Sequence, residues 1–561
     1  MLEKISYIFR KYPLFRTLLW LGVVALIVVI VSLINTQVTL DPVLDSINPP
    51  VASPGDVIVL RGDHFGNMRN NGFVEIGGER LTASSYLSWT DDEIKVLLPS
   101  NVQEGLVIVD VSGNRSKPSV FTNETTIPIT VPVNPVSKTP VISYLSSESA
   151  SVGQLLIITG ANFGESRKDA KVLFTTNRIK TANSLGNHDV ISDKIYASTD
   201  DFDYESWADT EIRVRVPDGA ATGDVVVLTE KGLSKPQPLK ILGRGTKTFS
   251  NEKTYILKIS ADISNIKAVT GSSFTLHIPR PETCASQPEI EMTECQPQPL
   301  LENYRNSVIH QVDFKDITDN KQEFTQNFSV KVYEISCSIN KEQVRPFSDK
   351  AKPLYVEYTS SSSFIPSDNE QVIALGTSIV KKERNPYNQA LLVYNYLLKN
   401  FSLLQFLRTG DFSPEEVISE KTADAYDFAM LFVSVLRSLK IPAKIMSGVL
   451  VDNELKTRNH WWNEFYIENF GWVPVDLALG AGLEYNFFQQ VENRQSYYFG
   501  NLDSQHILFS SDWSIIKPSL SNNKIVYRPR SYALQNIWEE SSDGTDSYSS
   551  FWNNPVILGV Y

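Results

Sequence analysis

The 561-residue chain is long enough for several domains, each with a hydrophobic core of its own. Because 42% of its residues are hydrophobic and 21% are charged, its composition argues against long disordered regions. Its formal net charge of −12 disfavours nucleic acid as a partner, since surfaces that bind nucleic acid concentrate lysine and arginine.

An apolar segment near the N-terminus, residues 13–36, has the length of about one bilayer crossing. The basic residues that precede its apolar core are Lys4, Arg10, Lys11 and Arg16. The positive-inside rule therefore predicts a transmembrane signal anchor, with residues 1–12 as a cytoplasmic tail and the rest of the chain outside the cytoplasm. A cleaved signal peptide is the alternative, but its apolar region is usually shorter, and residues 31–37 contain no small-x-small cleavage site.

The next 200 residues contain an internal duplication. Residues 55–66 match residues 153–164, and residues 89–99 match residues 207–217. Each copy consists of short runs rich in Val, Ile and Leu, separated by turn residues, which is typical of a small β-sandwich. The Gly-x-x-Phe-Gly turn in both copies resembles the corresponding turn of immunoglobulin-like IPT/TIG repeats.

The resemblance assigns residues 40–123 and residues 140–243 to two IPT/TIG-like repeats. Between them, residues 124–139 form a Pro-rich linker that favours extended, semi-rigid chain. The second copy carries an insertion with the sequence Asp-Asp-Phe-Asp at residues 200–203, which could bind calcium. Because the glycine and the distal glutamate of an EF-hand loop are missing, a solvated acidic loop is the preferred interpretation.

Residues 246–364 alternate apolar and polar side chains again, which predicts a third β-sandwich. The cysteines of the chain are Cys284, Cys295 and Cys337. This odd and sparse set predicts neither a disulfide framework nor a zinc site. Pairing of Cys284 with Cys295 and three free thiols are both compatible with the sequence.

Helix signals define a domain over residues 365–510, which is followed by a C-terminal extension over residues 511–561. Asn385-Pro386 and the segment Ser413-Pro-Glu-Glu416 are typical helix starts. A further helix is expected to begin near Ala425, because apolar side chains recur on one face. The residues of this face are Phe428, Leu431, Phe432, Val435 and Leu436.

Three segments of this domain carry a second resemblance. They are Ala425-Tyr-Asp427-Phe428-Ala429, His460-Trp461-Trp462-Asn-Glu464-Phe-Tyr466 and Gly471-Trp472-Val-Pro-Val-Asp476. Together they resemble the core of transglutaminase-like, papain-related cysteine enzymes, which implies an α+β fold with a Cys–His–Asp triad. The resemblance places position 425 at the nucleophile, His460 at the base and Asp476 at the orienting acid.

The residue at the nucleophile position, however, is Ala425, and a methyl group cannot attack a carbonyl. Neither adjacent residue, Asp424 or Tyr426, offers a replacement. Because loss of a triad nucleophile reduces turnover by a factor on the order of 10⁶, the sequence predicts a pseudoenzyme. His460 and Asp476 are then expected as a remnant, either a buried structural pair or part of a ligand site.

Trp461, Trp462, Glu464 and Trp472 are candidates for a binding cleft, although the three tryptophans suit a core equally well. An envelope peptide, a glycan or a partner protein would be the ligand, and no cofactor or metal is expected. One alternative is a slow non-covalent hydrolase in which His460 activates water with help from Asp476. Another is a purely adhesive ectodomain at the cell envelope.

Overall fold

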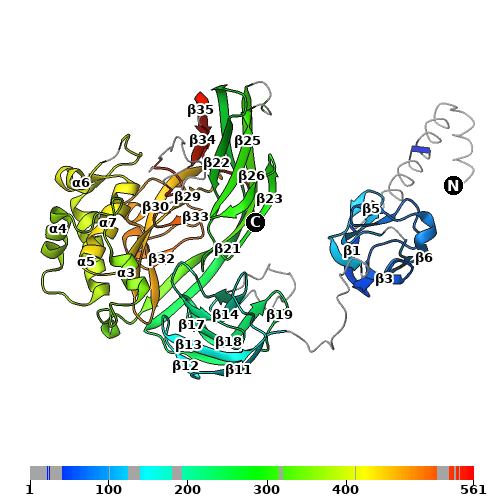
Figure 1. The fold of residues 1–561 in the computed structure, drawn as a ribbon, viewed down its shortest axis with the longest axis horizontal. Coiled ribbons are helices and arrows are strands. Elements are labelled where there is room, and N and C mark those ends of the chain that lie inside the picture. The colour runs from blue at the N-terminus through cyan, green and yellow to red at the C-terminus, as the bar shows by residue number, and fades with distance from the viewer. Residues whose placement is uncertain are drawn as a thin grey trace, which may run out of the picture. The chain divides into compact units, whose positions relative to one another are not determined.

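The computed structural model describes residues 41–99, 102–123, 139–179, 193–314, 317, 320–410, 412–514, 528, 530–535, 538–542 and 544–561, together with Gly22, Val24 and Ala25. The predicted anchor over residues 13–36 thus lies outside the described residues, except for these three positions. No helix in the described part of the chain is long and apolar enough to cross a membrane. Two compact units make up the chain, Met1–Val136 and Ser137–Tyr561 (Figure 1).

The first unit contains a β-sandwich. Its strands are β1 (Val43–Asn48), β2 (Val51–Ala52), β3 (Val57–Asp63), β4 (Phe73–Ile76), β5 (Glu79–Arg80), β6 (Tyr86–Trp89), β7 (Glu93–Leu97), β8 (Gly105–Val111), β9 (Asn114–Arg115) and β10 (Ser119–Asn123), with a 3-10 turn η1 (Ala83–Ser85). One sheet has the order β1-β3-β7-β6 and the other β2-β10-β8-β4-β5, with β9 beside β8. Their alternating inward side chains form a single core, as the pattern of short apolar runs predicts.

The Gly-x-x-Phe-Gly turn has a structural reason. A Cβ atom on Gly62 would lie 1.8 Å from the carbonyl oxygen of Val43, so only glycine allows β1 and β3 to approach this closely. Phe65 is buried beneath the turn, and its carbonyl accepts a hydrogen bond of 2.8 Å from Trp89 Nε1. The turn and the tryptophan of each repeat therefore act as one packing unit.

The second unit begins with the second copy of this sandwich. Its strands are β11 (Val141–Leu145), β12 (Ser149–Ala150), β13 (Leu155–Ala161), β14 (Lys171–Thr176), β15 (Lys194–Tyr196), β16 (Tyr204–Trp207), β17 (Glu211–Arg215), β18 (Ala220–Thr229), β19 (Gly232–Leu233) and β20 (Gln237–Ile241). The orders β11-β13-β17-β16 and β12-β20-β18-β14-β15 repeat those of the first copy. The same contact recurs, since Trp207 Nε1 donates to the carbonyl of Phe163 at 3.1 Å.

The third sandwich is built on a 24-residue strand, β21 (Gly245–Ala268). The other strands of its two sheets are β22 (Ser273–Pro279), β23 (Glu289–Gln296), β24 (Leu301–Tyr304), β25 (Ser307–Asp313), β26 (Lys321–Ile339), β32 (Asn501–Leu502), β34 (Glu539–Ser541), β35 (Thr545–Trp552) and β36 (Val556–Val560). The last three strands come from the predicted C-terminal extension, which is therefore not a separate segment. They pair with β21 and β22, whose edges would otherwise expose unpaired backbone groups.

The remaining domain is α+β. Its elements are η4 (Lys341–Gln343), α3 (Pro353–Thr359), α4 (Glu370–Val380), α5 (Pro386–Asn400), β27 (Ser402–Leu403), α6 (Pro414–Glu420), β28 (Thr422–Ala423), α7 (Ala425–Ser438), β29 (Ala443–Val451), β30 (Thr457–Ile467), β31 (Gly471–Val475), α8 (Leu477–Gly480), α9 (Arg494–Tyr497) and β33 (His506–Ser511). The sheet has the order β31-β30-β29-β33. The helix starts predicted at Asn385 and Ser413 are confirmed by side-chain caps.

Both faces of this sheet are covered, as Figure 1 shows: the helices lie on one side and the long strands of the third sandwich on the other. Successive residues of β29 point to opposite faces. Met446 and Leu450 belong to the core shared with the helices, whereas Val449 and Val451 belong to the core of the sandwich. The α+β domain and the third sandwich are therefore packed as one body.

At the junction of β29 and β33, one added methyl group should strongly lower the stability of the fold. A Cβ atom at Gly448 would lie 1.9 Å from the backbone oxygen of Ile507, which cannot move without breaking the sheet. We expect Gly448→Ala to lower the free energy of unfolding by about 3 kcal/mol. Gly559→Ala, whose Cβ would contact only the Tyr561 side chain at 3.6 Å or more, should stay within about 0.5 kcal/mol. Urea unfolding of both variants measures this, and equal effects would contradict it.

Candidate functional site

The position predicted for a nucleophile, Ala425, is the first residue of α7. Asp424 caps the helix by accepting a hydrogen bond of 2.9 Å from the backbone N–H of Asp427, and the Asp427 carboxylate accepts one of 3.2 Å from the backbone N–H of Asp424. This reciprocal capping box sets where the helix begins. Ala425 is only 4% exposed and packs in the core of the α+β domain. The first turn of the helix thus carries a methyl group where the resemblance to thiol enzymes predicts a sulfur atom.

Two arginines surround this first turn. Arg530 lies 2.6 Å from an oxygen of Asp424 and 2.8 Å from one of Asp427. Its guanidinium also sits 4.6 Å from the centre of the Tyr426 ring. Arg408 lies 2.9 Å from the second oxygen of Asp427. Burial and then Asp424 raise the pKa of Asp427, against the opposing effect of Arg530. Arg530 therefore lies across the helix start and pairs with both of its acidic residues.

The predicted base and acid are in contact. His460 lies in β30, and Asp476 follows β31 as the N-cap of α8. His460 Nε2 is 2.5 Å from Asp476 Oδ2, and Oδ1 of Asp476 accepts a hydrogen bond of 2.8 Å from the backbone N–H of Leu479. Both side chains are fully buried. The tertiary structure thus brings together the two residues that the resemblance assigns to one triad.

A third residue of this network, His506, was not predicted. It opens β33, and its Nε2 lies 3.1 Å from the same Asp476 oxygen that His460 contacts. Its Nδ1 lies 2.9 Å from Asp503, whose other oxygen accepts a hydrogen bond of 2.6 Å from the hydroxyl of Tyr498. The signal in the sequence is weak: a histidine three residues after Asp503, in a segment without a motif of its own.

The protonation states follow from burial and from the shared carboxylate. Burial lowers the pKa of His460 more than Asp476 raises it, so His460 is neutral at pH 7. Burial alone would raise the pKa of Asp476, but the two histidines outweigh it and hold that pKa below its ordinary value. Burial also opposes protonation of His506, yet Asp503 and then Asp476 raise its pKa to about 9. His506 is therefore an imidazolium between two carboxylates.

Neutral His460 donates its Nε2–H to the ionised Asp476, which leaves Nδ1 as a bare acceptor. This Nδ1 atom is buried, and it has no hydrogen-bond partner among the described residues. A general base presents its lone pair to a nucleophile in this way. The ring is thus held in the state that a triad requires, but the methyl group of Ala425 has no proton that Nδ1 could accept.

His460, Asp476 and His506 are also the residues whose ligand atoms could surround a metal ion, since these atoms lie within 4.8 Å of one another. Tetrahedral zinc with ligands at about 2.0 Å keeps them about 3.3 Å apart. His460 Nε2 and Asp476 Oδ2 are only 2.5 Å apart, which is a hydrogen-bond distance. As arranged here, the three side chains satisfy one another and do not fit a zinc ion.

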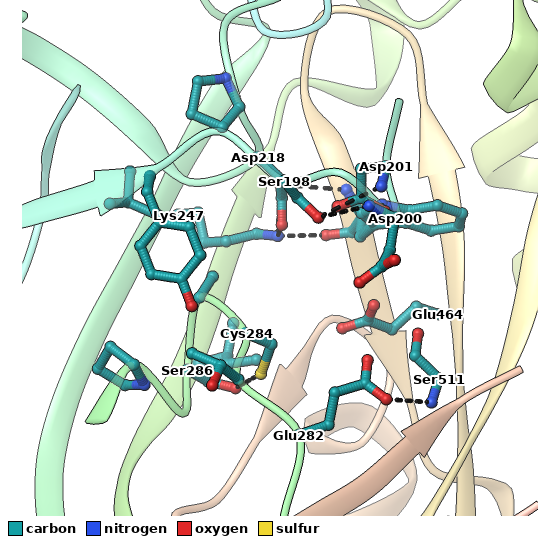
Figure 2. A pocket seen from close by; sticks show the side chains of 18 of the residues that line it. Ser198, Asp200, Asp201, Asp218, Lys247, Glu282, Cys284, Ser286, Glu464 and Ser511 are labelled. Carbon is teal, nitrogen blue, oxygen red and sulfur yellow. Dashed lines mark hydrogen bonds and ion pairs between the residues drawn. The ribbon is translucent and has the colours of Figure 1, made fainter. Parts of the chain in front are cut away.

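The four predicted cleft residues do not share one cleft. Trp461 and Trp462 are 1% and 2% exposed and belong to the same core cluster as α7, as the alternative interpretation expects. Glu464 and Trp472 line a different cavity, of about 70 Å³, where the second repeat, the third sandwich and the α+β domain meet (Figure 2). The aromatic residues beside His460 therefore stabilise the fold and are closed to a ligand.

Carboxylates are the main charged groups that line this cavity. They are Asp200, Asp201, Asp203, Asp218, Glu282 and Glu464. Figure 2 shows five of them, all except Asp203, converging from three domains. Lys247 pairs with Asp218 at 2.6 Å, and burial raises the pKa of Glu282 to about 8. The cavity thus holds more acidic groups than the nearby lysines neutralise.

The prediction of a solvated acidic loop at residues 200–203 holds for Asp200, which is exposed, but is wrong for Asp201 and Asp203. Asp203 is buried and accepts a hydrogen bond of 2.7 Å from the backbone N–H of Ser198. Asp201 accepts one of 2.9 Å from Trp472 Nε1 and lies 3.3 Å from Lys444 Nζ. These partners are 271 and 243 residues away in the chain, so local sequence could not reveal them.

All three cysteines are free thiols in the structure. Burial raises the pKa of Cys284 to about 11 and that of Cys337 to about 12. Neither thiol is therefore in the activated state that catalysis requires.

Residues 373–477 match the family model of the transglutaminase-like superfamily, and residues 42–132 match that of the IPT/TIG domain. Both resemblances that the motifs indicated are thereby confirmed for these parts of the chain. The protein is multidomain and mostly β-sandwich, with a transglutaminase-like domain toward its C-terminal end.

An uncharacterized protein of Haemophilus influenzae is 27% identical over 183 residues, which are 28% of this chain and 49% of that protein. Cyclomaltodextrin glucanotransferase of Paenibacillus macerans is 35% identical over 71 residues, 13% of this chain and 10% of that enzyme. The chain thus spans about half the length of the first relative and about a tenth of the second.

Among solved structures, the periplasmic domain of TgpA from Pseudomonas aeruginosa aligns with a TM-score of 0.24 and 9% identity, covering 40% of this chain and 86% of that one. SGBP-B from a xyloglucan utilization locus of Bacteroides uniformis aligns with a TM-score of 0.14 and 11% identity, covering 52% and 97%. Likenesses this distant carry no argument about function.

The network around Asp476 predicts that the stability of the folded state depends on pH. The folded pKa of His506, about 9, lies above its unfolded value of about 6.5, so protonation of His506 favours the folded state. This stabilisation is complete below pH of about 6.5 and is lost as pH rises through about 9. We expect His506→Gln to reduce this slope to the part that Glu282 contributes through its raised pKa of about 8, measured by urea unfolding of the full chain across that window.

His310 offers a matched control, because burial lowers its pKa to about 4 and it is neutral throughout the same window. His310→Gln should leave the slope between pH 6.5 and 9 unchanged. A slope that stays at its full wild-type value in His506→Gln would contradict the assignment of the charge to His506.

Proposed function

We propose that this chain is a transglutaminase-like pseudoenzyme, anchored in a membrane by residues 13–36, whose extracytoplasmic part binds or scaffolds a ligand at the cell envelope. The charge pattern around the apolar segment supports the anchor and its orientation. Ala425 at the start of α7 supports the absence of acyl transfer. This alanine, beside an otherwise ordered His–Asp pair, is the observation that carries the proposal.

No other nucleophile takes the place of the missing thiol within the described residues. The hydroxyl of Thr422, three residues upstream, is engaged by Arg408 and Glu420. Cys337 lies on β26 in the third sandwich. Covalent catalysis at this helix start would therefore need a group that the chain does not supply there.

The burial of His460 argues against the alternative of a non-covalent hydrolase. Such an enzyme needs a water molecule and a substrate bond within hydrogen-bond reach of the base. His460 has an exposed fraction of 0%, and its Nδ1 contacts neither solvent nor a polar side chain of the described residues. A buried, hydrogen-bonded pair with a structural role accounts better for its retention.

Restoring the sulfur tests the proposal. We expect the full chain with Ala425→Cys to react with iodoacetamide at pH 7 faster than the native chain, because the neutral His460 ring can accept the thiol proton. The double variant Ala425→Cys, His460→Ala should lose this gain, typically by a factor of about 10² or more. The native chain measures the background from its three other thiols.

Amine incorporation into a glutamine peptide is followed in the native chain, in Ala425→Cys, in the double variant and in the single variant His460→Ala. We expect no turnover by the native chain. Turnover by the native chain that His460→Ala abolishes would contradict the pseudoenzyme.

A further inference from the structure

An open groove of about 660 Å³ lies at the N-terminal end of β30, where Asn459, the residue before His460, lines it. Five segments form it: the loop after β27, the turn between β29 and β30, the first residues of β30, the loop after α8 and the turn between β35 and β36. We call it the amide groove, after Asn459, Asn486 and Asn554, which line it together with Phe406, Tyr485 and Arg458.

We propose that the amide groove binds a neutral oligosaccharide. This inference rests on the proposed binding function and assigns it a place and a ligand class. Four properties of the groove support it: an exposed aromatic ring, unused amide groups, balanced charge and a rigid floor.

The aromatic ring belongs to Phe406, whose exposed fraction is 84%. It makes no ring contact with the described part of the protein, so it does not serve packing. The hydrophobic effect disfavours a phenyl ring left in water, and such a ring at the rim of a polar groove offers a flat platform for an apolar surface. The C–H face of a pyranose ring is an apolar surface of that size and shape.

The asparagine side chains supply the hydrogen-bonding groups of the groove. The side chains of Asn486 and Asn554 are exposed and form no hydrogen bond with the described residues. Each carboxamide has one acceptor oxygen and two N–H donors. A pair of neighbouring hydroxyl groups, each both donor and acceptor, matches this combination, whereas a purely ionic ligand does not.

The formal charges of the side chains that line the groove sum to zero. Its acidic residues are Asp452 and Glu484, and its basic residues are Lys456 and Arg458. Lys456 pairs with Glu454, and Arg458 donates to the backbone oxygens of Glu484 and Gln405 at 3.2 and 2.8 Å. With two acidic and two basic side chains, the groove has no excess positive charge to attract a phosphate or carboxylate.

The same contacts make the groove rigid before a ligand arrives. Arg458 ties the loop at Gln405 to the loop at Glu484, and Gln405 accepts a hydrogen bond of 2.8 Å from the backbone N–H of Glu484. Tyr485 is held by Gln505 at 2.8 Å and by an edge-on contact with Phe487. A preformed site loses less entropy on binding, which favours weakly interacting ligands such as sugars.

Isothermal titration calorimetry on the full chain tests the proposal, with linear hexasaccharides of glucose, xylose, mannose and N-acetylglucosamine at millimolar concentration. We expect at least one to bind, and Phe406→Ala to weaken it by about fivefold or more. Asn486→Ala should weaken it as well. Phe551→Ala is the matched control, since Phe551 is 65% exposed on β35, outside the groove, and should leave affinity unchanged.

Absence of binding by all four hexasaccharides would overturn the proposal, and so would binding that Phe406→Ala leaves intact. A pool of decapeptides is titrated in parallel. Binding of peptides alone, with loss on Phe406→Ala, would overturn the sugar assignment while keeping the proposed binding function. Turnover by the native chain in the amine-incorporation assay would instead overturn the pseudoenzyme and leave the groove assignment standing.

Discussion

One buried carboxylate oxygen, Oδ2 of Asp476, organises the C-terminal half of this protein. It receives hydrogen bonds from two histidines that come from different strands, β30 and β33, and its own backbone follows β31. A buried ion left unpaired is strongly destabilising, so each of these strands must arrive in register for the others to be stable. The network thereby gives His460 and Asp476 a structural role that does not depend on a nucleophile at position 425.

A second set of buried charges joins the domains. Lys247 pairs with Asp218 and also donates to the backbone oxygen of Trp472, while Lys444 lies between Asp201 and Glu464. These contacts connect the second IPT/TIG-like repeat to the transglutaminase-like domain across more than 200 residues of chain. The second repeat therefore belongs to one compact unit with the C-terminal domains, whereas the first repeat forms a unit of its own.

The two possible sites of this protein differ in access. The triad remnant is largely enclosed: His460 is fully buried, Ala425 is 4% exposed, and Arg530 lies across the helix start. The amide groove is open and carries unused hydrogen-bonding groups. Covalent catalysis needs a nucleophile in contact with a substrate, whereas ligand binding needs only a preformed surface. The exposed residues of the amide groove form such a surface.

Local sequence patterns determined a large part of this architecture. The repeated Gly-x-x-Phe-Gly turn is readable because only glycine permits the backbone approach at Gly62 and Gly160. The caps at Asn385 and Ser413 and the apolar face of α7 are equally local, since they depend on neighbours within one or two helical turns. The alanine at position 425 also needs no structure, because no fold can give a methyl group the reactivity of a thiol.

Only the tertiary structure decided the rest. His506 joins Asp476 from 30 residues away, Arg530 reaches Asp424 from 106, and β35 pairs with β21 from the far end of the chain. The burial of Trp461 and Trp462, the docking of Asp201 and the place of Phe406 on a groove depend on such distant neighbours as well. Residue type and spacing encode what a segment does with its own backbone, whereas burial and charge pairing are properties of segments that meet only when the chain has folded.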